Sequence, residues 1–355
     1  MMTQWHDFLA TQGATIENRT TGSATIVDFG NAHAELEATA EGHVLCDLSH
    51  LGLLQVAGDD AVTFLQGQVT NDIKQLDGAN NQFTGSQYTG YCNPKGRLLA
   101  LFLAFAHLDH IHLQLDSALV EPILKRLKMY VMRSKVVITD VSEQLLRLGV
   151  SGANSEALLQ QLFGAAPQQP HQILTLEKAT LIRLPGPVPR YQIYTHKDNA
   201  PALWQQLVQH FTPAGKTCWD YLEIQAGIPE IVPATQEAFV PQMINLDALG
   251  GINFKKGCYT GQEIVARTHY LGKVKRRTQL AHIASSGIEP PKPADAIHAH
   301  GTDDVVGQVV RSAAAPDGGF DVLAEIRLES LENGKVQWQG QDLTLLQLPY
   351  SIAAE

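Results

Sequence analysis

Few cysteines and no long apolar run set the first limits on this chain of 355 residues. Its four cysteines, Cys46, Cys92, Cys218 and Cys258, form no Cys-x-x-Cys pair, which argues against a disulfide framework and against a zinc or iron–sulfur site built from local ligands. No apolar stretch reaches the roughly 20 residues that a membrane-spanning helix needs. The first residues lack a signal or transit pattern. We therefore expect a cytoplasmic protein with reduced thiols and no membrane segment.

Charged residues are also scarce, at 17% of the chain, and acids outnumber bases by 36 to 26 for a net charge of −10. Such an acidic chain is unsuited to general nucleic-acid binding, which depends on neutralising phosphates. The 14 histidines do not indicate a metal site, because His107, His110 and His112 have no carboxylate clearly placed to complete a ligand set. We expect no bound metal.

Hydrophobic periodicity predicts an α/β body followed by an all-β tail. We expect two similar units in the body, the second spanning about residues 146–215. The predicted strands of the body are 44–56, 98–106, 111–115, 134–139, 146–150, 179–184 and 190–195, and its predicted helices follow Asp60 and cover 117–129, 154–163, 199–210 and 219–226. Five short strands are predicted in the tail, at 278–284, 305–312, 320–328, 335–339 and 342–347. This pattern predicts a body at 1–277 and a small antiparallel β-barrel at 278–355.

The most informative segment is 248–267, which contains several glycines and one cysteine. Cys258 follows Lys256 by two residues, and a helix can begin at Gln262. A thiol near an ammonium group and glycine-bounded backbone amides gains thiolate character and becomes reactive. The opposite interpretation stays open, because a lone cysteine is usually a small, buried and inert residue.

A run of basic residues overlaps this segment. Between residues 255 and 277 there are seven Lys or Arg residues and a single acid, Glu263. The basic residues are Lys255, Lys256, Arg267, Lys273, Lys275, Arg276 and Arg277. Such a run is commonly a solvated face. In an otherwise acidic chain it also fits an anionic partner, such as a polycarboxylate, a phosphate or an RNA backbone.

The sequence KKGCYTGQE at Lys255–Glu263 resembles the signature of the folate-binding YgfZ family, whose members are relatives of the glycine-cleavage T-protein. Four further segments extend the resemblance, so that it covers most of residues 40–277. They are QAGIP at 225–229, PQMINL at 241–246, DLSHLG at 47–52 and FLQGQVTND at 64–72.

The resemblance implies an α+β fold, with a T-protein-like folate-binding body of ferredoxin-like α/β units and a C-terminal antiparallel β-barrel. Tetrahydrofolate or another reduced folate is the implied ligand. Trp219 matches a tryptophan of the folate cleft, whose ring can stack on a pterin. Leu51 lies near the position of a second Trp in some members. Gln225 stands where YgfZ-family members and T-proteins usually have Glu. The implied partners are iron–sulfur enzymes, including one that modifies tRNA, or their assembly proteins.

Two departures from the T-protein pattern bear on activity. The positions of its acidic pair are occupied by Ala100 and Leu101, which cannot accept or orient a proton. The region that contains its pterin-gripping Glu corresponds to Pro189–Tyr194, which includes Tyr191 and no acid. These replacements argue against glycine cleavage.

Three functions are considered at this point. The favoured one is a folate-binding assembly or repair factor, not a classical enzyme, in which Cys258 is a working thiol and residues 255–277 bind a client, tRNA or another anion. The second is a folate-dependent aminomethyl or methyl transferase in which Asp72 or Glu263 replaces the missing acid. The third is an interaction scaffold with a vestigial folate cleft. The residues expected to act in the signature segment are Cys258, Lys256, Gly257, Tyr259, Gly261, Gln262, Glu263 and Arg267, and those expected to bind folate are Trp219, Leu51, Gln225 and Tyr191.

Overall fold

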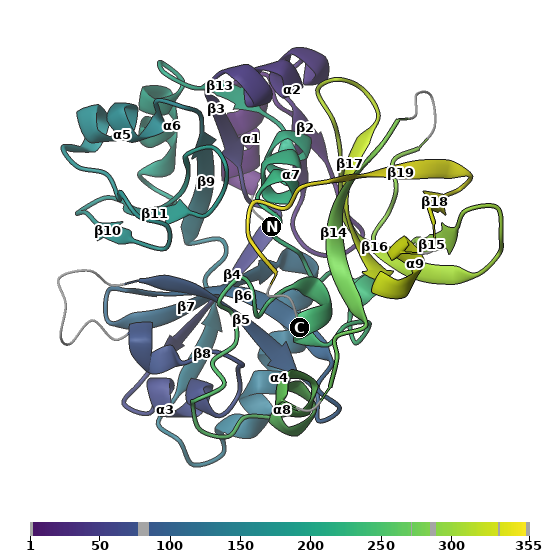
Figure 1. Cartoon of the computed structure of the whole chain (residues 1–355). Helices are drawn as coiled ribbons and strands as arrows, with labels where there is room; N and C mark the ends of the chain where they lie inside the picture. Colours follow the sequence, from purple (N-terminus) through teal and green to yellow (C-terminus); the bar gives the residue numbers. More distant parts are fainter. Residues whose placement is uncertain (1–2, 77–84, 271, 285–288, 333, 353–355) are drawn as a thin grey trace. The chain divides into compact units, whose positions relative to one another are not determined.

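The computed structural model describes residues 3–76, 85–270, 272–284, 289–332 and 334–352 (Figure 1). The chain divides into two compact units. The first comprises residues 1–65, 73–87 and 102–219, and the second comprises residues 66–72, 88–101 and 220–355. The body-and-barrel boundary expected near residue 277 stays a prediction.

The first unit contains a six-stranded sheet of order β10-β11-β12-β9-β3-β13, in which only β13 and β3 run parallel. The strands are β3 (Val44–Asp47), β9 (Leu145–Ser151), β10 (Ile173–Thr175), β11 (Thr180–Leu184), β12 (Arg190–His196) and β13 (Thr212–Ala214). Side chains alternate between the two faces of a strand. Leu146, Leu148 and Val150 of β9 therefore share one face and enter a hydrophobic core with Ile193 of β12. Helices α1 (Thr3–Thr11), α5 (Ser155–Phe163) and α6 (Ala200–Leu207) also contribute to this core, as do Leu45 of β3 and Leu181 of β11.

A second sheet has the order β5-β6-β7-β4-β8, and the pairs of β7 with β4 and β6, and of β4 with β8, are antiparallel. Its strands are β4 (Leu51–Ala57), β5 (Ser86–Cys92), β6 (Leu98–His107), β7 (His110–Asp116) and β8 (Val137–Asp140). A 3-10 turn, η2 (Ser117–Leu119), and helix α4 (Val120–Val131) connect β7 to β8. Two of the boundaries between the two units fall within β5 and β6.

The remaining elements before residue 226 are short. They are the hairpin β1 (Thr15–Glu17) and β2 (Thr25–Asp28), the helices α2 (Ala32–Glu41), α3 (Ala61–Gln66) and α7 (Lys216–Gln225), and the 3-10 turn η1 (Ile73–Leu76). Asn31 caps α2, since its side chain accepts a hydrogen bond from the amide of Ala34.

The second unit contains a closed barrel of order β14-β17-β16-β15-β18-β19, with every pair antiparallel. Its strands are β14 (Arg276–Ile283), β15 (Ala296–Ala299), β16 (Val305–Ala314), β17 (Phe320–Arg327), β18 (Val336–Trp338) and β19 (Gln341–Leu346). Alternate side chains such as Ala281, Val322 and Trp338 fill its interior. Before and beside the barrel lie η3 (Pro233–Thr235), η4 (Pro241–Ile244), α8 (Gln262–Tyr270) and α9 (Leu328–Glu332).

The predicted α+β class and the C-terminal antiparallel barrel are confirmed. The sequence patterns missed every element before residue 44, together with β5, β10, β13, β15 and α9. The single strand predicted at 44–56 is two strands, β3 and β4, which belong to different sheets. All seven residues of β5 are buried, so the strand shows no alternation of polar and apolar residues. Strand β15 has only four residues and follows a proline-rich loop. Helix α7 begins at Lys216, three residues before the predicted start.

Gly149 on β9 provides a test of packing in the first unit. A methyl group at this position would lie 2.5–2.9 Å from three carbons of the Trp219 ring, which is itself fully buried. We expect Gly149→Ala to lower the free energy of unfolding by about 1–3 kcal/mol, because the ring cannot move aside without disturbing its neighbours. The measurement is the midpoint of urea unfolding followed by tryptophan fluorescence. Gly85→Ala is the control, since its nearest atom would be 3.7 Å away, and an equal loss there would contradict the packing argument.

Candidate functional site

The signature segment forms a loop that precedes α8 in the second unit, and Lys256 fastens this loop. The Nζ atom of Lys256 donates hydrogen bonds to the carbonyl oxygens of Val69, at 2.6 Å, and Asn71, at 2.8 Å. It also lies 5.1 Å from the centroid of the Tyr259 ring, within the range of a cation–π interaction. The ammonium group is therefore part of the internal structure of the loop.

The segment 69–72 makes further bonds to the residues before the loop. The hydroxyl of Thr70 donates to the carbonyl of Gly251 at 2.7 Å, and the side-chain amide of Asn71 donates to the carbonyl of Gly250 at 2.8 Å. The amide of Asn253 donates to the carbonyl of Thr70 at 3.0 Å. Two of the segments that carry the family resemblance, about 180 residues apart in sequence, thus lie together within one unit.

The other end of the loop lies against the turn at 93–97. Gly261 has a φ of +83°, and a side chain there would lie 2.5 Å from the carbonyl of Asn93 and 2.9 Å from Gly96. Glycine is required by both the backbone angle and the close approach. Helix α8 begins at the next residue, Gln262, as the sequence predicted.

Cys258 is exposed, whereas Cys46, Cys92 and Cys218 are buried. The description of a cysteine as a small buried residue fits those three, and burial raises the pKa of the Cys92 thiol to about 12. That description does not fit Cys258, which is exposed to solvent between the two anchored ends of the loop. Gly257, Glu263 and Arg267 are exposed as well.

Burial also shifts the pKa values of Lys256 and Tyr259, which lie on either side of Cys258 in the sequence. The pKa of Lys256 is lowered to about 8, mainly by loss of solvent, although Asp72 acts in the opposite direction. The pKa of Tyr259 is raised by burial and then by the nearby Cys92. Near neutral pH Lys256 is mostly charged, and it loses its proton more readily than an ordinary lysine.

The predicted basic run needs correction. Arg277 is buried and forms a two-bond ion pair with Asp247, at 2.6 and 3.0 Å, and Arg276 pairs with Glu325 at 2.9 Å. Together with Lys256, three of the seven basic residues therefore bind within the second unit. Sequence alone could not separate these internal cations from exposed ones. The exposed members are Lys255, Arg267, Lys273 and Lys275.

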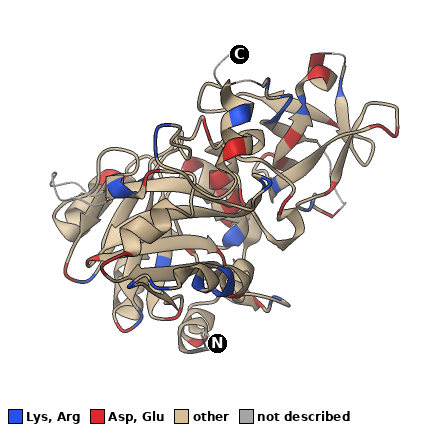
Figure 2. Ribbon diagram, turned by 90° about the horizontal axis from the view of Figure 1, so that it is seen from below, with Lys and Arg blue, Asp and Glu red and all other residues tan. Residues whose placement is uncertain are grey.

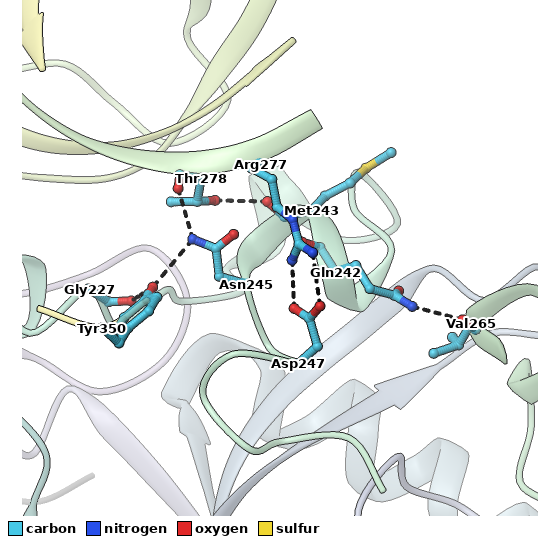
Figure 3. Close-up of polar contacts among 9 residues, drawn as sticks. All are labelled: Gly227, Gln242, Met243, Asn245, Asp247, Val265, Arg277, Thr278 and Tyr350. Carbon is cyan, nitrogen blue, oxygen red and sulfur yellow. Dashed lines mark hydrogen bonds and ion pairs between the residues drawn. The ribbon is translucent and has the colours of Figure 1, made fainter. Parts of the chain in front are cut away.

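Figure 3 shows how the segment 241–247 connects α8 to the barrel. Gln242 donates from its side chain to the carbonyl of Val265 in α8, at 2.7 Å. Asn245 donates to the carbonyl of Thr278 in β14, at 2.8 Å, and Arg277 binds Asp247. These contacts give PQMINL a structural role, because Gln242 holds the helix that follows the loop and Asn245 holds the first strand of the barrel.

The predicted folate residue Trp219 lies in the first unit and is fully buried. Its ring packs on Gly149 of β9, and the guanidinium carbon of Arg190 lies 5.7 Å from the ring centroid. Its Nε1 atom has no hydrogen-bond partner among the described residues. Gln192 shares this face, since it pairs in register with Gly149.

The other three predicted folate residues have different surroundings. Tyr191 is in the hydrophobic core, on the opposite face of β12 from Arg190 and Gln192. Leu51 is the buried first residue of β4. Gln225 belongs to the second unit and donates to Asp321 at 2.6 Å. As folate contacts all four residues, Trp219 included, stay predictions. Strand alternation places Arg190 and Gln192 on the face that contacts Trp219, and the sequence patterns did not single these two residues out.

Comparison with known proteins identifies the class first. The chain matches the family model described as the GCVT N-terminal domain over residues 5–253. Its fold is similar to the solved glycine cleavage system aminomethyltransferase T from Bartonella henselae, with a TM-score of 0.73 over 97% of this chain and 96% of that one. The sequence identity of 16% limits this likeness to the fold. The fold is thus T-protein-like, as predicted.

A closer relative defines the branch. The chain is 32% identical over 327 residues to the tRNA-modifying protein YgfZ of Colwellia psychrerythraea strain 34H. The aligned region covers 88% of this chain and 94% of that protein. The chain therefore belongs to the YgfZ family, a relative of the glycine-cleavage T-protein. Among the described helices none is long and apolar enough to span a membrane. Nor do the described residues include a group of three or more His, Cys, Asp or Glu arranged to hold a metal ion.

The number of solvent-accessible thiols can be measured directly. We expect a thiol reagent such as Ellman's reagent to modify one cysteine in the native protein and four after denaturation, because only Cys258 is exposed. Cys258→Ser should leave no rapidly reacting thiol in the native state. Rapid modification of a second cysteine in that variant would contradict the burial of Cys46, Cys92 and Cys218.

The lowered pKa of Lys256 predicts a specific pH dependence of stability. Between about pH 8 and pH 10.5 the unfolded chain binds more protons at this residue than the folded chain. The unfolding free energy of the wild type should therefore rise with pH across this window relative to Lys256→Met. Within this window the substitution should cost roughly 1–3 kcal/mol, since the carbonyls of Val69 and Asn71 lose their donor.

The matched control is Lys255→Met, because Lys255 is exposed and adjacent. It should change the unfolding free energy by less than about 0.5 kcal/mol. Urea titrations at several pH values provide both comparisons. Parallel curves for wild type and Lys256→Met would show that Lys256 is not the titrating group.

Proposed function

We propose that this chain is a folate-binding factor that supports the assembly, maintenance or repair of iron–sulfur enzymes, including tRNA-modifying ones, with Cys258 as its working thiol. The observation that carries this proposal is the presentation of Cys258. It is exposed on a loop fixed at Lys256 and Gly261, whereas the other three cysteines are buried. A loop anchored in this way holds a reactive group in place without contributing that group to the core.

The proposed ligand is tetrahydrofolate or another reduced folate. The GcvT-like fold supports a folate, and the buried indole N–H of Trp219, which lacks an acceptor among the described residues, suits the acceptor-rich ring and amide groups of such a ligand. Arg190 and Gln192 lie on the same face of the sheet and would hold it with Trp219. The guanidinium group favours a ligand with carboxylates over a cationic one.

A folate-dependent one-carbon transferase is the alternative, and the residues at 100 and 101 count against it. Ala100 lies buried in β6, and Leu101 follows it, so neither position supplies a carboxyl group. Glu263 is exposed at the start of α8. Purified protein that transferred a one-carbon group from a folate to an amine would revive this alternative.

The function of the thiol is tested in a strain that lacks this protein. We expect Cys258→Ser to fold normally and to leave an iron–sulfur tRNA-modifying enzyme as inactive as in the deletion strain, because serine cannot replace the proposed chemistry of the sulfur. Mass spectrometry of the modified nucleosides in tRNA measures that activity. Lys128→Gln, a change at an exposed lysine of α4 in the first unit, should restore it fully. Full rescue by Cys258→Ser would reduce Cys258 to a structural residue.

The folate part is tested separately by anaerobic calorimetric titration with tetrahydrofolate. We expect saturable binding that Cys258→Ser leaves unchanged and that Trp219→Phe weakens by about fivefold or more, since this change removes one buried donor but keeps an aromatic ring. Circular dichroism checks that Trp219→Phe remains folded. No binding by the wild type would overturn the folate assignment and favour the scaffold interpretation.

A further inference from the structure

Three aromatic rings gather beside the loop that carries Cys258. Phe254, just before Lys255, stacks on His269 of α8 with ring centroids 3.7 Å apart and an interplanar angle of 11°. Tyr270 meets His269 at 4.7 Å and 73°, so it stands outside that stack. The Phe254–His269 pair fastens the loop to the end of α8. Tyr270 is 64% exposed, far more than such fastening requires.

Exposed cations lie close to these rings in the sequence. Once Lys256, Arg276 and Arg277 are assigned to internal contacts, the exposed charges between residues 254 and 275 are four basic and one acidic. The acid is Glu263, and the bases are Lys255, Arg267, Lys273 and Lys275. The whole chain has fewer Lys and Arg (blue in Figure 2) than Asp and Glu (red). We name Phe254, His269, Tyr270 and these four bases the aromatic–basic face.

Exposed rings beside exposed cations are the two elements that bind single-stranded nucleic acid. Cations neutralise phosphates, and an aromatic face stacks on an unpaired base without strong sequence preference. An acidic protein would use the cations but would leave the exposed ring of Tyr270 without a function. The combination therefore favours a nucleic acid over an acidic polypeptide.

We propose that the aromatic–basic face binds a single-stranded segment of RNA, with Tyr270 stacking on an unpaired base. This inference rests on the proposed function and deepens it, because it gives the second unit a contact with the RNA on which the served enzymes act. The bound strand would pass beside Cys258, which belongs to the loop that begins at Phe254.

Fluorescence anisotropy with a labelled oligouridylate of about 12 nucleotides tests the proposal, since such a length covers a typical single-strand site. We expect the purified full chain to bind the probe, with affinity falling as salt rises. Tyr270→Ala should weaken binding about tenfold, in line with the loss of one stacked base, and Tyr270→Phe should stay within about twofold of wild type. Combined Lys273→Gln and Lys275→Gln should flatten the salt dependence.

The control is Tyr130→Ala, because Tyr130 is also an exposed tyrosine, 42% exposed, but lies in α4 of the first unit. It should bind the probe as the wild type does. Absence of binding by the wild type would overturn the proposal, and so would equal binding by Tyr270→Ala. Displacement of the probe by a short oligoglutamate as effective as unlabelled RNA would also overturn it, in favour of an acidic protein partner.

Failure here is distinguishable from failure of the proposed function. Tyr270→Ala should titrate with tetrahydrofolate as the wild type does, and Cys258→Ser should bind the RNA probe normally. If RNA binding is absent while rescue still depends on Cys258, the thiol function stands and only the RNA contact is lost.

Discussion

The candidate site depends on the bond between the ammonium group of Lys256 and the backbone carbonyls of Val69 and Asn71. A partly buried charge is tolerated only where polar groups compensate it, and here two carbonyl dipoles and the Tyr259 ring do so without a direct ion pair to that ammonium among the described residues. The cost of partial desolvation is visible in the lowered pKa of Lys256. Because Lys256 is held inward, the next residues of the loop turn outward, and Cys258 reaches solvent.

The helix after the loop is held by a second set of contacts. Gln242 binds the backbone of α8, and Arg277 binds Asp247 from the first strand of the barrel (Figure 3). Charged partners removed from water are costly to separate, so this pair resists displacement of η4 from β14. The barrel therefore serves as the support on which α8 and its loop are built. This explains why the signature and the segment 241–246 form one pattern in the sequence.

The sheet of the first unit has a polar face of a different character. Arg147 and Arg190 are both fully or almost fully buried, and they lie on the face that contacts Trp219. Arg147 donates to the carbonyls of Ser142 and Leu145, and Arg190 donates to the carbonyl of Pro185. Arg190 thus stands in the region where the T-protein resemblance expects a pterin-gripping Glu.

Local pattern determined the helices and strands of good periodicity, the antiparallel tail and the signature segment around Cys258. The local pattern missed several elements, among them β5, which is buried on both faces, and the four-residue β15. It also could not find the carbonyl acceptors of Lys256, about 185 residues away, or distinguish the buried Arg277 from the exposed Lys275. Periodicity and motif depend on neighbours in the chain, so the sequence by itself determined the local elements and the family signature. Which of them face solvent depends on contacts between distant segments, and only the tertiary structure decided that.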